Sequence, residues 1–248
     1  MNLWRLEWLR MTRTKRWMAI FAVFTFFGIV GPLSARYIGE IVERFGGGVQ
    51  VTFPEPTPAD GIMQYSANVQ QLGLLVLLMI AAGALTIESR YEMAVFLRTR
   101  VAATSRLLIP RYVVVAATGV LAFVAGGLLA WYETAVLIGT PDGGAMAAGM
   151  LYGSIYLLFA VAVVAFFGSV LKNVLPTVIV TLVVLLILPI IGLIPSVTDW
   201  LPSHLVGALD GLVRGAAIGG FLKATFVTLA STLALLYGTI RVLVRREL

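Results

Sequence analysis

The sequence predicts an all-α integral membrane protein whose helices cross the membrane six times. Hydrophobic residues make up 60% of the 248-residue chain and charged residues only 12%, whereas soluble domains carry about 25% charged residues. The apolar residues form six long stretches that are almost free of charge, and about 20 such residues suffice to span a bilayer as a helix. We therefore expect a single transmembrane domain over residues 1–248.

The six predicted spans are separated by segments of different character. Residues 1–16 are basic, and Trp4, Trp8 and Met11 share one helical stripe there, which predicts an amphipathic helix lying in the membrane interface. Residues 36–60 contain Gly-Gly-Gly and three prolines, which favour an extended, solvated connector. The spans are expected at residues of about 17–38, 62–87, 112–132, 146–171, 174–194 and 224–240.

The stretch from 195 to 223 is too polar and too often interrupted by Gly and Pro to span the membrane. It is also too apolar for a free loop, and backbone that does not span at membrane depth needs protein around it. We therefore predict short external helices that re-enter the outer leaflet. Trp200, His204 and Asp210 are the candidate residues of an external gate.

The distribution of charge predicts the orientation of the chain. With six spans, one side of the membrane receives 14 of the 18 Lys and Arg residues, and loops rich in these residues stay in the cytoplasm. Both termini and the segment 88–111 are therefore predicted to be cytoplasmic. On the outer side, Gln64, Asn68 and Gln71 recur at helical spacing, which indicates either a polar vestibule or a helix end that faces water.

The segment 88–111 is the long charged interruption between apolar stretches. As a helix it would place Met93, Phe96 and Leu97 on one side, surrounded by charged residues. Such a helix either lies flat at the interface or forms a docking surface, because interfaces bury a few large anchors within a polar rim. The docking interpretation assigns contacts to Glu88, Arg90, Glu92, Met93, Phe96, Leu97, Arg98, Arg100 and Arg106.

Several kinds of chemistry have no motif in the sequence. The predicted spans carry charges only at their ends, whereas carriers driven by protons or sodium usually place Asp, Glu or His within the membrane. The chain has no cysteine, a single histidine, no H-E-x-x-H zinc motif and no G-x-x-x-x-G-K-[ST] phosphate loop. We therefore expect neither a bound metal nor enzymatic activity, and energy for uphill transport must come from another polypeptide.

The order of these parts resembles the membrane subunit of an ABC type-2 exporter. In that family the cytoplasmic segment after the second span opens with an acidic and basic pair, as Glu88 and Arg90 do, and continues as a helix and a Ser-Arg turn, as 93–97 and 104–106 do. The Gly-Thr and the turn proline of the family are missing here. The stretch 200–209 resembles its Pro-containing external helix, and Lys172 with Asn173 resembles its basic inner turn.

The resemblance implies a permease subunit of the bacterial or archaeal cytoplasmic membrane, which exports a drug, an antibiotic or a lipid-like solute. Two permease chains, identical or related, would rest on two cytoplasmic ATPase subunits that bind ATP and Mg. Lys172 would then join the ATPase-coupling residues. A nonenzymatic membrane assembly protein and an ion-coupled carrier are the alternatives, and neither needs an ATPase. No nucleic-acid partner is expected, because the topology accounts for the basic charge.

Overall fold

The computed structural model describes residues 3–45, 55–86 and 105–245, and every regular element in these ranges is a helix. The helices are α1 (Leu3–Arg13), α2 (Arg16–Phe45), α3 (Pro58–Asn68), the π-helical turn η1 (Val69–Gly73), α4 (Leu74–Leu85), α6 (Ser105–Leu137), α7 (Gly143–Leu171), α8 (Val174–Ile191), α9 (Pro195–Thr198), the 3₁₀ helix η3 (Pro202–Gly207), α10 (Ala208–Val213), the 3₁₀ helix η4 (Ile218–Phe221) and α11 (Leu222–Arg245).

Six helical stretches are long and apolar enough to cross a membrane, which confirms the predicted all-α class and the predicted number of spans within the described residues. They cover Arg16–Glu40, Pro58–Leu85, Leu107–Leu137, Gly143–Leu171, Val174–Ile191 and Ile218–Arg245. The second stretch is a continuous helix composed of α3, η1 and α4.

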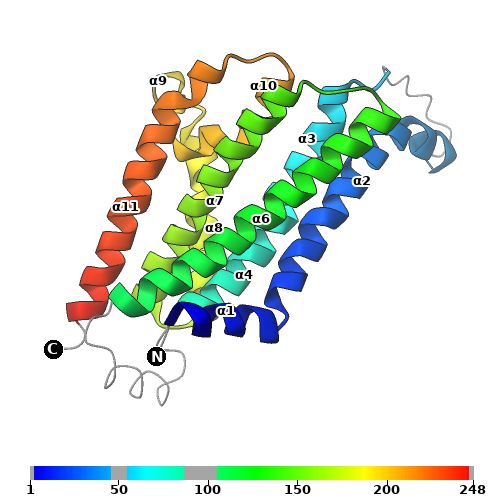
Figure 1. Cartoon of the computed structure of the whole chain (residues 1–248). Coiled ribbons are helices and arrows are strands. Elements are labelled where there is room, and N and C mark those ends of the chain that lie inside the picture. The colour runs from blue at the N-terminus through cyan, green and yellow to red at the C-terminus, as the bar shows by residue number, and fades with distance from the viewer. Residues whose placement is uncertain (1–2, 46–54, 87–104, 246–248) are drawn as a thin grey trace.

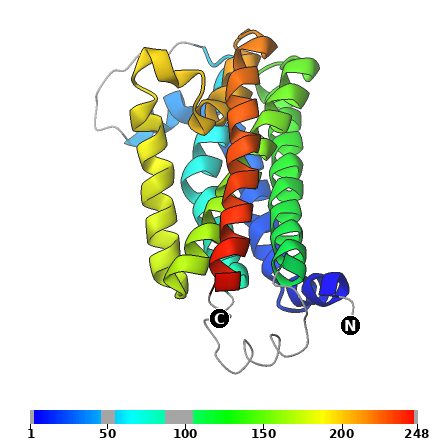
Figure 2. The same ribbon diagram turned by 90° about the vertical axis from the view of Figure 1, so that its left-hand side faces the viewer.

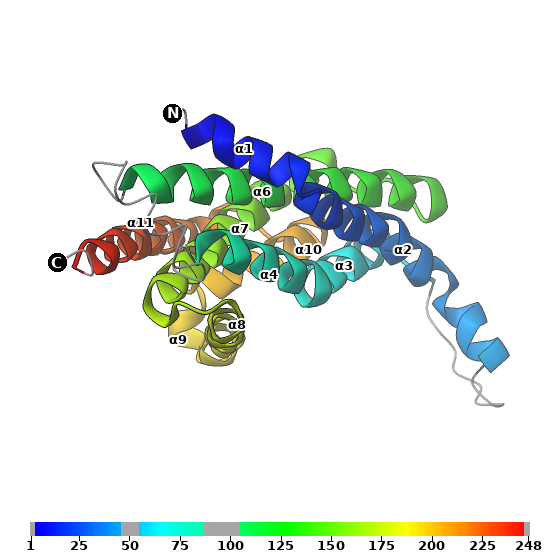
Figure 3. The same cartoon turned by 90° about the horizontal axis from the view of Figure 1, so that it is seen from below.

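The long helices run side by side, and the short helices gather at the two ends of the bundle. Helix α1 lies across one end, where α11 also finishes, and α9 and α10 lie at the opposite end (Figures 1 and 2). We refer to these as the α1 end and the α10 end. Helix α7 is the centre of the bundle, since it contacts α4, α6, α8, α10 and α11 (Figure 3).

Helices α2 and α6 approach each other closely through glycine. A Cβ atom on Gly28 would overlap the carbonyl oxygen of Gly126, and one on Gly126 would lie 2.5 Å from the carbonyl oxygen of Phe24. Small residues let membrane helices pack at short distance, where dispersion contacts replace the missing hydrophobic driving force. Close to this contact, a hydrogen bond joins α3 to α6. The Tyr65 hydroxyl donates to the Phe123 carbonyl at 2.7 Å.

Helices α8 and α11 are more loosely attached than the others. Only 22% of the most apolar window of each is buried, against 67% for α7. Large apolar side chains project from them, with Leu175 68%, Phe226 74% and Leu233 69% exposed. These faces are suited to lipid or to another polypeptide, because large apolar patches on a protein surface mark such contacts.

The structure corrects the predicted connector after the first span. Helix α2 continues to Phe45, so the expectation of extended chain over 36–60 is wrong for residues 36–45. This stretch contains no Pro and a single Gly, Gly39, and one isolated glycine does not end a helix that already has its hydrogen bonds in register. The second span also starts earlier than predicted, at Pro58.

A capping interaction explains this early start. The Thr57 N–H and the Thr57 hydroxyl both donate to Asp60 Oδ2, at 2.9 and 2.7 Å, and Pro58 follows at the first helical position. Both features are typical of a helix N-terminus. At the third span the helix is likewise longer than expected, because α6 begins at Ser105 and includes Arg111.

Candidate functional site

The predicted coupling surface lies mostly beyond the described residues. Its members Glu88, Arg90, Glu92, Met93, Phe96, Leu97, Arg98 and Arg100 fall in the range 87–104, which the structure does not describe. Arg106 belongs to the first turn of α6, and Lys172 follows the last residue of α7 with a φ of 62°. The left-handed conformation of Lys172 ends α7 and lets α8 begin two residues later. The coupling role of these residues stays a prediction.

A buried ion pair joins α1 to α6 at the α1 end. Arg111 Nε donates to Glu7 Oε1 at 2.9 Å, and the two side chains are only 6% and 7% exposed. Arg10 Nη1 lies 3.7 Å from the other Glu7 oxygen. Glu7 and Met11 are the buried residues of α1, whereas Trp4 and Trp8, which share the predicted stripe with Met11, are exposed. The interfacial position of α1 stays a prediction.

The sequence contained only a weak signal for this pair. Glu7 is the one acidic residue among the first sixteen, and Arg111 is followed by a long uncharged stretch. The two residues are 104 positions apart, so no local spacing indicates that they meet. The prediction counted both as contributors to topology and missed their contact.

The candidate gate residues at the α10 end each have a different partner. The His204 ring stacks on Phe221 with 4.8 Å between ring centroids, and the Lys223 ammonium lies 5.6 Å from the centre of the Trp200 ring. Asp210 accepts a hydrogen bond from Arg214 at 2.9 Å. The structure therefore places His204 in η3, Asp210 in α10 and Trp200 in the turn between α9 and η3, in three separate contacts.

Two polar links tie these short helices to the second span. Arg214 Nη2 lies 3.8 Å from Asp60 Oδ1, and both side chains are partly exposed. The Gln70 amide donates to the Val206 carbonyl at 3.1 Å and to the Ser66 hydroxyl at 3.2 Å. The links of Arg214 to Asp60 and of Gln70 to Val206 were not predicted, since each joins residues more than a hundred positions apart.

The predicted vestibule residues follow a regular α-helical spacing that the structure does not keep. Gln64 and Asn68 lie in α3, whereas Gln71 lies in the π-helical turn, which shifts the helical register. A cavity of about 30 Å³ lies nearby, and Gln70 is among its lining residues. The residues that line the cavity are Ser66, Val69, Gln70, Leu74, Phe123, Gly153, Tyr156, Leu157, Val206 and Leu209. None of the three predicted residues is among them, and their vestibule role stays a prediction.

A wide apolar groove opens on the side of the bundle between α7, α8 and α11. Its volume is about 430 Å³. Seven of its lining residues are apolar and the eighth is a serine: Phe159, Val163, Phe166, Phe167, Val184, Ala234, Leu235 and Ser231. The groove exists because α8 and α11 both pack on α7, and it suits an apolar molecule or side chain.

Comparison with known proteins finds a distant relative. The chain is 18% identical to the "Uncharacterized transmembrane protein YxlG" of Bacillus subtilis (strain 168) over 209 residues, which cover 83% of this chain and 81% of the relative. No protein-family model matches the chain, and no solved structure matches it. Together with the six apolar helices, this similarity supports a multi-pass transmembrane protein.

Proposed function

We propose that the chain is the membrane subunit of an ATP-driven exporter for hydrophobic or amphipathic solutes. The apolar groove between α7, α8 and α11 carries this proposal. Its volume of about 430 Å³ falls within the range of roughly 300 to 1,000 Å³ that is typical of small-molecule sites. Because the groove opens at the side of the bundle, an apolar solute can enter it from the bilayer.

The packing of the bundle favours a transporter made of two such chains. The middle of α7 is filled, with Ala160, Val161 and Ala162 each 0% exposed, so the described residues leave little room for a route through one copy. Helices α8 and α11 present wide apolar faces instead. A route between two copies would use these faces, in line with the resemblance to type-2 exporters.

The source of energy in this proposal is a separate ATPase. The spans carry charges only towards their ends, whereas ion-coupled carriers usually place Asp, Glu or His in the middle of the membrane, and the chain lacks a phosphate-binding loop. Two cytoplasmic ATPase subunits would hold ATP and Mg and dock on the segment 88–106, which leads directly into α6. In this arrangement the protein lies in the cytoplasmic membrane of a bacterium or archaeon, with both termini in the cytoplasm.

The test is to purify the chain in mild detergent, identify the proteins that accompany it, and measure solute export from vesicles. We expect an ATPase with a phosphate-binding loop to copurify, and export to require ATP. Phe96→Asp or Leu97→Asp should weaken ATPase association or uncouple hydrolysis from export. Thr99→Asp is the matched control, because Thr99 lies on another side of the predicted helix.

The alternatives give different results in the same experiments. Export that follows an ion gradient and continues without ATP would identify a carrier. A chain that copurifies with other membrane proteins but with no ATPase would fit an assembly protein. Normal coupling by correctly inserted Phe96→Asp and Leu97→Asp variants would defeat the assignment of the docking surface.

A further inference from the structure

A small cavity lies inside the bundle where several parts of the chain meet. It is lined by residues of the second span, α6, α7 and the external helices η3 and α10. Its volume of about 30 Å³ has room for about two water molecules, since each needs roughly 10 to 15 Å³. Most of its lining residues are apolar, so the few polar ones decide what the cavity can hold.

Tyr156 of α7 brings a buried hydroxyl group to this cavity. Tyr156 is 6% exposed and lines the cavity, and its hydroxyl forms no hydrogen bond with any of the described residues. The hydroxyls of Tyr65, Tyr112 and Tyr152 each donate to a backbone carbonyl, at 2.7, 2.9 and 3.0 Å. A buried hydroxyl without a partner destabilises a folded protein. Tyr156 therefore needs a partner other than the described residues.

The second span contributes two more polar groups to the lining. The Gln70 amide nitrogen donates to the Ser66 hydroxyl at 3.2 Å and to the Val206 carbonyl at 3.1 Å. Within the described residues, the proton of the Ser66 hydroxyl and the oxygen of the Gln70 amide have no partner. Gln70 belongs to the π-helical turn η1, and such turns are frequent at functional sites. Three groups can therefore hydrogen-bond a molecule in the cavity, and a buried water molecule typically makes about three such bonds.

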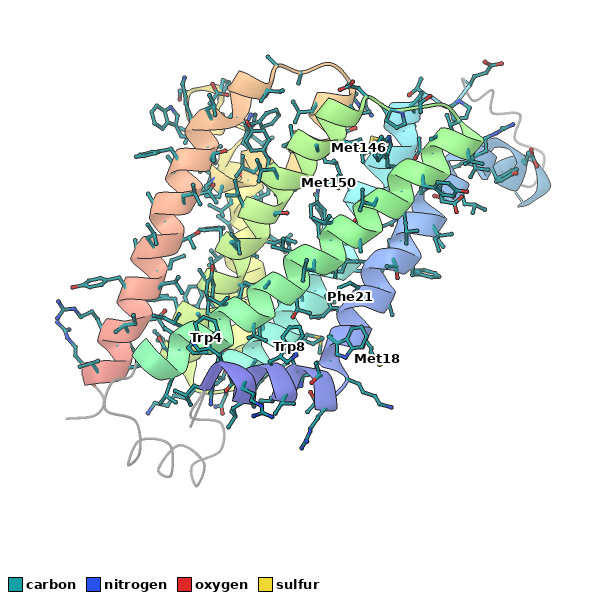
Figure 4. The ribbon with its side chains drawn as sticks, viewed as in Figure 1. Trp4, Trp8, Met18, Phe21, Met146 and Met150 are labelled. Carbon is teal, nitrogen blue, oxygen red and sulfur yellow. The ribbon has the colours of Figure 1, made fainter. Side chains whose placement is uncertain are left out.

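The cavity is separated from bulk water. Gln70 lies near the middle of the 28-residue span Pro58–Leu85, which places the cavity at membrane depth. Towards the α10 end, Met146 and Met150 are buried, and Figure 4 shows both on the part of α7 nearest that end. A Cβ atom on Gly127 of α6 would lie 2.9 Å from the Met150 sulfur, so this part of the interior is filled. A molecule in the cavity should therefore exchange slowly with the solvent.

We propose that the cavity binds ordered water, which connects the Tyr156 hydroxyl to the Ser66 hydroxyl and the Gln70 amide oxygen. Water can accept from the two hydroxyls and donate to the amide oxygen, and ordered water commonly satisfies buried polar groups that no side chain reaches. The water joins α7 to the second span where Gln70 also holds the Val206 carbonyl of η3. It thereby supports the attachment of the external helices. This proposal does not depend on an ATPase or on transport.

The first test is thermal unfolding of the full-length Tyr156→Phe protein in detergent. If water bridges the hydroxyl, the substitution removes a hydrogen bond, and the melting temperature should fall by about 2 to 4 °C. If the hydroxyl has no partner, its removal should leave the melting temperature unchanged or raise it, because an unsatisfied buried group is lost. That result would overturn the proposal. Tyr112→Phe is the matched control, since it removes a direct hydrogen bond to the Leu158 carbonyl from a residue outside the cavity lining and should lower the melting temperature by a similar amount.

The water itself is detected by radiolytic labelling of the wild-type protein. A short X-ray pulse converts water into hydroxyl radicals, which oxidise the nearest side chains, and mass spectrometry locates the products. After rapid mixing with water that carries a heavy oxygen isotope, Tyr156 should take up the light isotope from the bound water, whereas the exposed Tyr132 should take up the heavy one. Tyr112, which is buried but does not line the cavity, should stay unlabelled. Labelling of Tyr156 no stronger than that of Tyr112 would contradict a water site.

A double-mutant cycle tests the connection between the two helices. Ser66→Ala and Tyr156→Phe each remove one end of the water bridge, so the combined loss of stability should be smaller than the sum of the two single losses. Additive losses would mean that the two residues share no water. The cycle is measured in a glucoside and in a zwitterionic detergent, because a loss for Tyr156→Phe in only one of them would identify a detergent molecule in the cavity and refute the water.

Discussion

The Glu7–Arg111 pair shows how one contact can fix the position of α1. Taking two charges out of water is costly. A charge-assisted hydrogen bond of 2.9 Å between Arg111 Nε and Glu7 Oε1 offsets much of that free-energy cost. The pair cannot form unless α1 lies against the first turns of α6. It therefore specifies where the N-terminal helix docks, which apolar contacts alone would specify less well.

We expect Glu7→Gln to lower the free energy of unfolding by about 3 kcal/mol, because it leaves the buried Arg111 charge without its counterion. The melting temperature of the purified protein should fall by several degrees. Replacing both partners, as in Glu7→Leu/Arg111→Met, should cost less than the single change, since no buried charge then remains.

Asp210→Asn provides the comparison for Glu7→Gln. It breaks the exposed pair with Arg214, which should cost less than about 1 kcal/mol because solvent screens the interaction. A loss as large as that of Glu7→Gln would mean that burial does not determine the strength of these pairs. A double variant worse than Glu7→Gln alone would likewise contradict the role given to the uncompensated charge.

The helices could be predicted as elements because about 20 uncharged residues in a row can cross a membrane only in a structure that satisfies all backbone hydrogen bonds, which a helix does within one segment. Their ends could not be predicted as well. The Thr57–Asp60 cap starts α3 early, and the π-helical turn at Val69–Gly73 changes which polar side chains share a face. Both depend on one or two local hydrogen bonds, and hydropathy carries no information about those.

Close packing of α2 on α6 gives a prediction for Gly126. Gly126→Ala should lower the free energy of unfolding by about 1 to 3 kcal/mol, because the new Cβ meets the Phe24 carbonyl at 2.5 Å and backbone has to move. Thermal unfolding in detergent measures the effect. Gly219→Ala is the control, since a Cβ there meets no atom within 4 Å, and equal losses in both variants would refute the packing argument.

At the scale of the whole molecule, the sequence predicted the class and the number of spans, whereas the contacts between distant segments came only from the structure. Gln70 with Val206 and Glu7 with Arg111 are separated by 136 and 104 positions. Hydropathy places each helix in the membrane but does not say which helices are neighbours. The loose attachment of α8 and α11, and hence the groove, depends on that arrangement and was not predicted.

The orientation of the bundle in the membrane is the final prediction, and it rests on charge. Lys and Arg are concentrated at the α1 end, so this end should stay in the cytoplasm. The chain has no cysteine, so a single cysteine can be introduced at Asn173, in the exposed turn between α7 and α8, or at Thr140, in the exposed turn between α6 and α7. A thiol reagent that cannot cross membranes should label Thr140→Cys in intact cells and should label Asn173→Cys only after the cells are opened.

The two turns flank the same helix, so each variant is a control for the expression and insertion of the other. Labelling of Asn173→Cys in intact cells, with Thr140→Cys protected, would invert the topology and would place the segment 88–106 where no cytoplasmic ATPase can reach it.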